Sequence, residues 1–153
     1  MSFAKIYTRG LLGLHAPQIE VEVHISSGLP SLTIVGLPEA AVRESKDRVR
    51  SAIINSGFQF PSKRLTINLA PADLPKDGSR LDLPIALGIL IASGQLPENS
   101  TDGFDFIGEL ALDGHLRPVS GTLTIAMACQ QAQHRLLLPV ANLDEANQLP
   151  NFQ

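Results

Sequence analysis

Four charged side chains lie close together in the middle of the chain and are the first candidates for chemistry. They are Lys76, Asp77, Arg80 and Asp82, which fall within seven residues. Such a set offers acids, a base and cations, and loops held between rigid elements often carry this kind of chemistry. The plainer interpretation is a solvated turn, in which Pro75 and Gly78 set the path of the backbone. The spacing alone leaves both interpretations open.

A wider group of basic residues suggests contact with phosphate or with an acidic partner. Three fall on the outer face of the helix expected over residues 38–57, two follow that helix, and two lie in the charged turn. The candidate contact residues are Arg43, Lys46, Arg50, Lys63, Arg64, Lys76 and Arg80. The alternative is a helix face of ion pairs in the favourable i,i+4 order. Those pairs would be Glu39 with Arg43 and Glu44 with Arg48.

Several familiar sites are absent from the sequence. It has no GxxxxGK[ST] loop to cradle a nucleotide phosphate, and no GxSxG nucleophile elbow. The four histidines stand singly, without an HxxxH or CxxC companion. The single cysteine, Cys129, lies in an apolar setting and is expected to be a buried structural residue. We therefore expect no catalytic residue, no metal site and no cofactor in this chain.

Composition limits the remaining classes of function. The 153 residues fit one domain, residues 1–153, and 44% hydrophobic content is typical of a globular fold. A net charge of -3 argues against coating nucleic acid by bulk charge, although a local basic patch stays open. No apolar run is long enough to span a bilayer, and the N-terminus has no signal-peptide core, so we expect a cytoplasmic protein without membrane contact.

The charged turn must be positioned by strands and helices of both kinds. Residues 18–25 alternate apolar and polar without a miss, which predicts a strand with one wet face. With the runs at 3–12 and 32–35 it is expected to form an antiparallel meander. Helices are expected over residues 38–57 and 121–133. A further helix is expected to begin at Leu83 or Pro84, with Asp82 as its N-cap, and to end at residue 93. Further strands are expected at residues 65–69, 104–112, 115–119 and 135–139, with a hairpin at Asp113-Gly114 and a last helical turn at 142–146. This order predicts an α+β fold of mixed α/β layers.

Part of this pattern resembles the proteolytic domain of Lon. The matching segments are Pro75-Lys-Asp-Gly78, Gly108-Glu109 and the hairpin at Asp113-Gly114. The resemblance implies the fold shared by that domain and the second domain of a small-subunit ribosomal protein. It also implies that Arg80 stands at the position of the nucleophilic serine and Leu123 at that of the lysine base. Since a Ser-Lys dyad needs both groups, we expect a Lon-like fold without peptidase activity.

Longer segments are similar to the N-terminal domain of the bacterial magnesium chelatase-like AAA+ family (ComM/YifB). They are Met1-Ser-Phe-Ala-Lys-Ile6, Gly36-Leu-Pro-Glu-Ala-Ala-Val-Arg-Glu-Ser45, Asn68-Leu-Ala-Pro-Ala-Asp73 and residues 76–86. The resemblance implies a hexameric ATPase that drives DNA branch migration in natural transformation. Its AAA+ module, which would bind ATP and Mg²⁺, and its C-terminal domain are expected outside this chain.

Three roles for the chain follow from that resemblance. The first is a non-catalytic accessory domain that engages DNA or assists assembly of the hexamer with its own AAA+ module. The second is a protein–protein docking domain without DNA contact. The third and weakest is a residual hydrolase.

Overall fold

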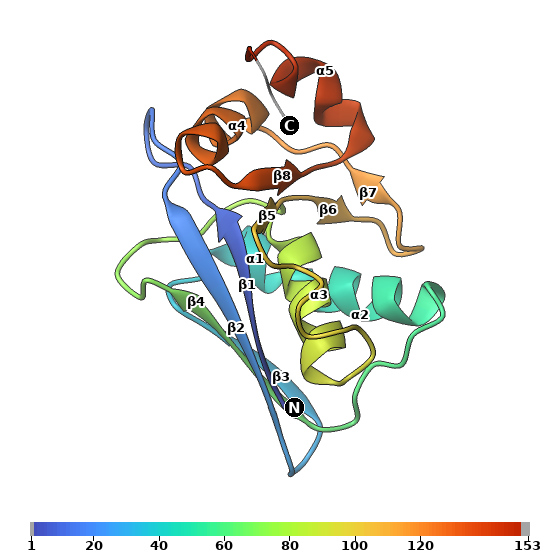
Figure 1. The fold of residues 1–153 in the computed structure, drawn as a ribbon. Coiled ribbons are helices and arrows are strands. Elements are labelled where there is room, and N and C mark those ends of the chain that lie inside the picture. Colours follow the sequence, from blue (N-terminus) through green and yellow to red (C-terminus); the bar gives the residue numbers. More distant parts are fainter. Residues whose placement is uncertain (1, 151–153) are drawn as a thin grey trace.

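A four-stranded sheet, covered by helices on one face, forms the larger part of the molecule (Figure 1). The computed structural model describes residues 2–150; Met1 and residues 151–153, at the two ends of the expected domain, lie outside the described residues. The strands are β1 (Phe3–Arg9), β2 (Gln18–Ser26), β3 (Ser31–Val35), β4 (Arg64–Ala70), β5 (Phe104–Phe106), β6 (Glu109–Leu110), β7 (Leu116–Arg117) and β8 (Arg135–Leu137). The helices are α1 (Ala40–Arg43), α2 (Ser45–Asn55), α3 (Asp82–Ala92), α4 (Thr122–Gln131), the 3-10 helix η1 (Val140–Asn142) and α5 (Leu143–Ala146).

The main sheet is mixed, in the order β1-β2-β4-β3. The alternation of β2 is confirmed, because Val21 and its apolar neighbours are buried on one face, with Ile6 and Leu69 as cross-strand partners. The predicted three-stranded meander is wrong. β3 does not pair with β2; β4 takes that place, and β3 lies outside it as a parallel neighbour. Parallel neighbours need a long crossover, which α1 and α2 provide.

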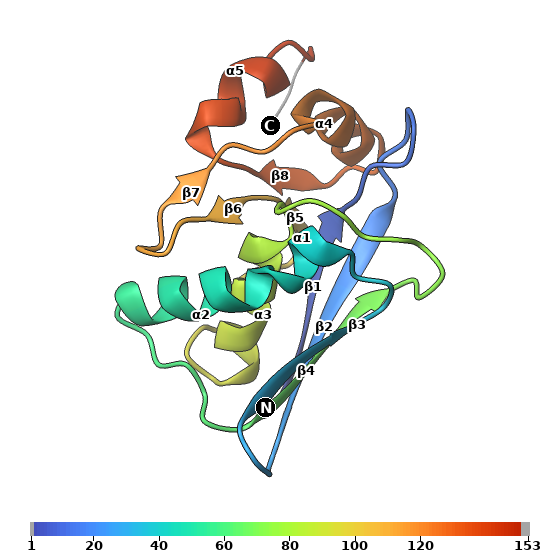
Figure 2. The same cartoon turned by 180° about the vertical axis from the view of Figure 1, so that it is seen from behind.

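Helix α3 packs on the buried face of this sheet, beside α2 (Figure 2). The approach is close, because a Cβ added at Gly88 would lie 2.6 Å from a methyl group of Val23. The helix begins at Asp82, with Leu81 as N-cap, so the prediction of Asp82 as N-cap is wrong. The helix predicted over 38–57 is split into α1 and α2, and Gly57, with φ of 88°, follows its end as expected.

The remaining elements form a second, smaller core at one end of the sheet, seen at the top of Figure 1. β5 and β8 pair in parallel, and the Asp113-Gly114 hairpin is confirmed as β6 and β7. The strand predicted over 104–112 is interrupted between Phe106 and Glu109. Within residues 2–150, no helix has both the length and the apolar content to cross a bilayer.

A buried carboxylate joins the two cores. Asp105 on β5 is fully buried and accepts hydrogen bonds from Arg9 Nε at 2.9 Å and from the Cys129 thiol at 3.3 Å. His134 Nδ1 lies 3.2 Å from the same carboxylate. Cys129 is buried, as the sequence predicts. Burial, followed by the nearby Asp105 charge, raises the pKa of the Cys129 thiol to about 12, so it is a protonated hydrogen-bond donor at neutral pH.

Candidate functional site

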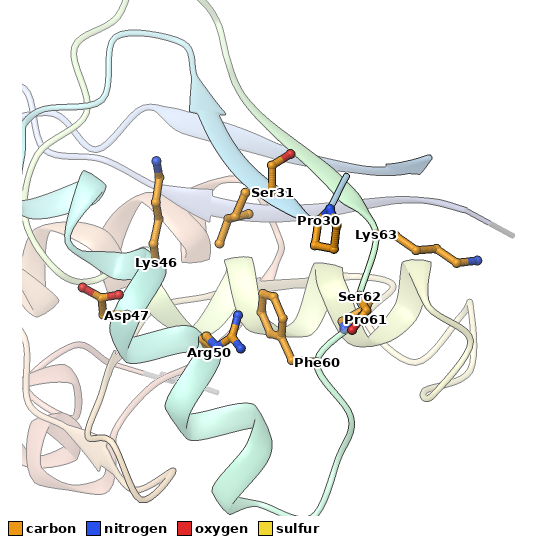
Figure 3. Close-up of a pocket in the computed structure, with 10 residues that line it drawn as sticks. Pro30, Ser31, Lys46, Asp47, Arg50, Phe60, Pro61, Ser62 and Lys63 are labelled. Atoms are coloured by element: carbon orange, nitrogen blue, oxygen red, sulfur yellow. The ribbon is translucent and has the colours of Figure 1, made fainter. Parts of the chain in front are cut away.

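A hollow of about 260 Å³ opens between α2, the start of β3 and the segment that leads into β4 (Figure 3). We call it the cationic hollow. Its lining residues are Pro30, Ser31, Leu32, Lys46, Asp47, Arg50, Phe60, Pro61, Ser62 and Lys63. Three of the basic residues expected from the sequence to contact an anion therefore meet around one depression, although Lys46 and Lys63 are far apart in the chain.

The positive charges of the hollow are not used in ion pairs. Within residues 2–150, Lys46, Arg50 and Lys63 make no salt bridge, and Asp47 is the only carboxylate in the lining. The same holds for Arg43 and Arg64, which are exposed outside the lining. A set of cations without internal partners attracts an anion more strongly than a neutralised face does.

The alternative of a helix face covered by ion pairs is wrong. Neither expected pair is among the salt bridges of residues 2–150: Glu39 and Arg43 form none with each other, and Arg48 pairs with the buried Asp82 instead of Glu44. The two contacts of Arg48 Nε and Nη2 with that carboxylate measure 2.6 and 3.1 Å. Arg48 is thus a structural cation, while the basic residues around it stay available at the surface.

An aromatic ring in the wall of the hollow was not identified from the sequence. The guanidinium carbon of Arg50 lies 5.2 Å from the centre of the Phe60 ring, within range of a cation–π contact. A reciprocal pair of hydrogen bonds, both 2.8 Å, ties the backbone of Gln59 to the side chain of Gln95 and fixes the segment that carries the ring. Gln95 is distant in the chain, so no local pattern could have pointed to this clamp.

Lys76, expected in the contact rim, lies inside the protein. Its residue is 1% exposed, and its ammonium group donates to the carbonyls of Gly36, at 2.6 Å, and of Pro71. Burial lowers the pKa of Lys76. The side chain joins the charged turn to the end of β3 and does not lie on the surface with the other basic residues.

Arg80 is also buried, at 5% exposure, so the charged turn adds no cation to the hollow. Its Nη1 donates to the Asp77 carbonyl at 3.1 Å, and Nε has no partner within the described residues. Burial lowers the pKa of this guanidinium as well. The adjacent Ser79 hydroxyl donates to a Glu109 carboxylate oxygen at 2.5 Å. Both contacts are local to the turn and the neighbouring β6.

The fourth charged residue of the turn, Asp82, is the centre of a buried network. Besides Arg48, its carboxylate accepts hydrogen bonds from the Ser45 hydroxyl at 2.5 Å and from the Leu110 backbone N–H at 3.0 Å. The turn that seemed suited to chemistry therefore fastens α2, α3 and β6 together. Among residues 2–150, no group of three or more His, Cys, Asp or Glu is arranged to hold a metal ion.

Comparison with known proteins gives a consistent assignment. The family model for subunit ChlI of Mg-chelatase matches residues 21–142. The chain is 54% identical over 145 residues to YifB of Escherichia coli (strain K12), covering 95% of this chain and 29% of YifB. It is 50% identical over 147 residues to the competence protein ComM of Haemophilus influenzae, covering 96% of this chain and 29% of ComM.

A more distant match supports the fold. The chain is 30% identical over 142 residues to a Lon protease of Chloroflexus aurantiacus, covering 86% of this chain and 17% of that protein. This similarity agrees with the mixed sheet and with the Lon-like fold implied by the sequence. The chain spans less than a third of the length of each relative named here.

Proposed function

The chain belongs to the family of the ChlI subunit of Mg-chelatase, and from that premise we propose that it is a non-catalytic accessory domain through which a magnesium chelatase-like ATPase engages DNA. In this proposal ATP and Mg²⁺ bind to an AAA+ module outside the chain, and six such modules assemble into a ring that drives branch migration. The chain supplies a contact surface and no reacting group.

The observation that supports DNA contact is the set of unpaired cations around the cationic hollow. Lys46, Arg50 and Lys63 line it without a salt bridge inside the described part of the chain, and Arg43 and Arg64 are further exposed cations that make none there. A chain of net charge -3 that leaves the three cations of the hollow without a salt bridge fits a polyanion such as the phosphate backbone.

The arrangement of the turn supports the absence of peptidase chemistry. By the resemblance to Lon, the buried Arg80 stands for the nucleophilic serine and the half-buried Leu123 for the lysine base. Ser79 donates its proton to Glu109, whereas the nearest lysine in the sequence, Lys76, is held by two carbonyl groups. Ser79 and Lys76 therefore do not form the hydrogen-bonded pair that a Ser-Lys dyad needs.

DNA binding by the chain, measured by fluorescence anisotropy across a salt titration, tests the proposal. Each phosphate contact contributes about -0.9 for a duplex, or about -0.7 for a single strand, to the slope of log K against log salt. The triple variant Lys46→Gln, Arg50→Gln, Lys63→Gln should therefore lose affinity, with a slope flatter by about 2. The matched control is Lys5→Gln, Arg117→Gln, Arg135→Gln, which removes the same charge elsewhere. Equal losses in both variants, or no binding at low salt, would contradict the proposal.

Exposed apolar side chains near the end of the described chain favour a second candidate, a docking domain without DNA contact. Val140 is 86% exposed, and Leu137 and Leu143, close to it in the chain, are each 40% exposed. This candidate predicts no DNA binding at low salt. It also predicts that Val140→Asp weakens capture of a separately produced AAA+ module of the parent protein, whereas Leu14→Asp, at another exposed leucine, does not.

A further inference from the structure

We propose that the cationic hollow takes a single strand of DNA, one unstacked base of which stacks on the Arg50 guanidinium while the flanking phosphates meet Lys46 and Lys63. The inference rests on the proposed function, because it names the form of DNA that the same surface recognises. It assigns a different task to each cation: one forms a stacking surface, and two neutralise charge.

The concave shape of the site favours a flexible strand. The basic residues line a depression of about 260 Å³, near the lower end of the range of ~300–1,000 Å³ usual for small-ligand pockets. A duplex is a stiff rod whose outward phosphates would reach only the rim of such a depression. A single strand bends, and its unstacked bases can enter a pocket of nucleotide size.

The Arg50–Phe60 pair supplies a stacking surface. Arg50 is exposed, and its guanidinium is held over the half-buried Phe60 ring by the cation–π contact. Arginine planes and aromatic rings are the surfaces on which proteins stack unpaired bases. Because the Gln59–Gln95 clamp fixes the segment behind the ring, the guanidinium is positioned before a base arrives.

The two lysines bracket this surface. Figure 3 shows Lys46 on α2 and Lys63 at the entry to β4 on opposite sides of Phe60. A second, open hollow of about 540 Å³ begins across the ridge formed by residues 60–63, and it shares Phe60 and Lys63 with the first. Its wall from the end of α3 carries neutral groups such as Ser93 and Gln95. A strand that leaves the cationic hollow past Lys63 therefore meets a continuous path.

The test compares three labelled probes on the chain: twelve thymidines, a twelve-position strand in which every base is replaced by an abasic site, and a twelve-base-pair hairpin duplex. We expect the thymidine strand to bind most tightly. Loss of one base stack should weaken binding about fivefold or more. The abasic strand keeps its phosphates, so it reports the charge contribution separately.

Two variants separate stacking from charge. Arg50→Lys keeps the charge and loses the plane, at an exposed position where folding is not at risk. Phe60→Leu keeps an apolar side chain and loses the ring. Both should weaken binding of the thymidine strand about fivefold, with an unchanged salt slope, and leave binding of the abasic strand unchanged. The controls are Arg135→Lys and Phe104→Leu, which disrupt a second Arg–Phe contact in the described part of the chain, at 4.9 Å.

Each outcome has a distinct meaning. If the duplex binds as tightly as the thymidine strand, or if Arg50→Lys weakens the abasic and thymidine strands equally, the stacking inference is wrong while DNA engagement stands. If none of the probes binds at low salt, the proposed function fails and the inference fails with it. If the control variants weaken binding as much as the hollow variants, the site lies elsewhere.

Discussion

Replacement of Asp82 by Asn should strongly destabilise the protein, because this side chain holds α2, α3 and β6 together. The carboxylate is fully buried and receives the Ser45 hydroxyl, two donors of Arg48 and the Leu110 N–H. An amide of the same size removes the negative charge. It also presents an N–H group toward partners that are themselves donors, so at least one contact becomes unfavourable.

The size of the effect follows from what stays buried. Breaking a buried ion pair by removing one partner costs about 3–5 kcal/mol. The Arg48 side chain is 22% exposed and recovers some hydration, so we expect a loss of about 3 kcal/mol in the free energy of unfolding. That is a large fraction of the roughly 5–15 kcal/mol that stabilises a typical domain.

Urea denaturation followed by circular dichroism at pH 7 measures this loss. The control is Asp113→Asn, at a side chain that is 67% exposed, which should change stability by less than about 0.5 kcal/mol. The double variant Asp82→Asn, Arg48→Met should lose less free energy of unfolding than the two single variants together, because each single change leaves the other residue without its partner. A loss below about 1 kcal/mol for Asp82→Asn, or strictly additive losses, would refute this account of the network.

Three further predictions concern Cys129, Lys76 and Gly36. The folded pKa of Cys129, about 12, lies above its ordinary value of 9.0, so its contribution to stability is complete below pH 9 and is lost as the pH rises. Between pH 8 and pH 10 the free energy of unfolding of the wild type, relative to that of Cys129→Ala, should fall by about 1.4 kcal/mol. If urea melts gave the same difference between the two proteins at both pH values, the raised pKa of Cys129 would be contradicted. Lys76→Met should cost about 2 kcal/mol of stability by leaving the Gly36 and Pro71 carbonyls unpaired, with DNA affinity unchanged at a temperature where the variant is folded. Gly36→Ala should lower the free energy of unfolding by more than about 2 kcal/mol in thermal melts, because φ is 104° and the new Cβ would collide with the Leu69 carbonyl. The control Gly57→Ala, where φ is 88° and the space around the Cβ is open, should lower it by about 1 kcal/mol.

The sequence predicts the elements that have a strong local pattern. The alternation along β2, the Asp-Gly turn between β6 and β7, and Gly57 after α2 each depend on neighbours in the chain, and each is found in the structure. The pairing of β3 depends on β4, which is some thirty residues away across two helices, and a five-residue strand carries no signal of its partner. Proximity in sequence therefore suggested a meander, whereas the crossover helices allowed the parallel pair.

In the candidate site, too, the sequence predicts local features and misses those that depend on distant contacts. The sequence names the cations Lys46, Arg50 and Lys63, but their meeting around one hollow depends on where α2 lies relative to the start of β3 and the segment before β4. The i,i+4 spacing of Glu44 and Arg48 does not predict that Arg48 binds Asp82, because Asp82 lies 34 residues away in the chain. A buried carboxylate competes more effectively for a guanidinium than an exposed glutamate does, since surface pairs contribute little.

Five of the seven basic residues that the sequence grouped together thus fall into two sets with opposite tasks. Lys76 and Arg80 are buried. Two backbone carbonyl groups hold Lys76, and the carbonyl and carboxylate of Asp77 hold Arg80, so both fix the turn in place. Lys46, Arg50 and Lys63 line the hollow and make no salt bridge within residues 2–150. A charge held inside the fold contributes to stability and little to the field seen by a ligand, whereas an exposed one does the reverse. Neutralising substitutions in the turn should therefore change unfolding and leave the salt dependence of DNA binding unaltered, and those around the hollow should do the opposite. The charged turn then supports the fold, and the proposed binding surface lies on α2 and the entry to β4.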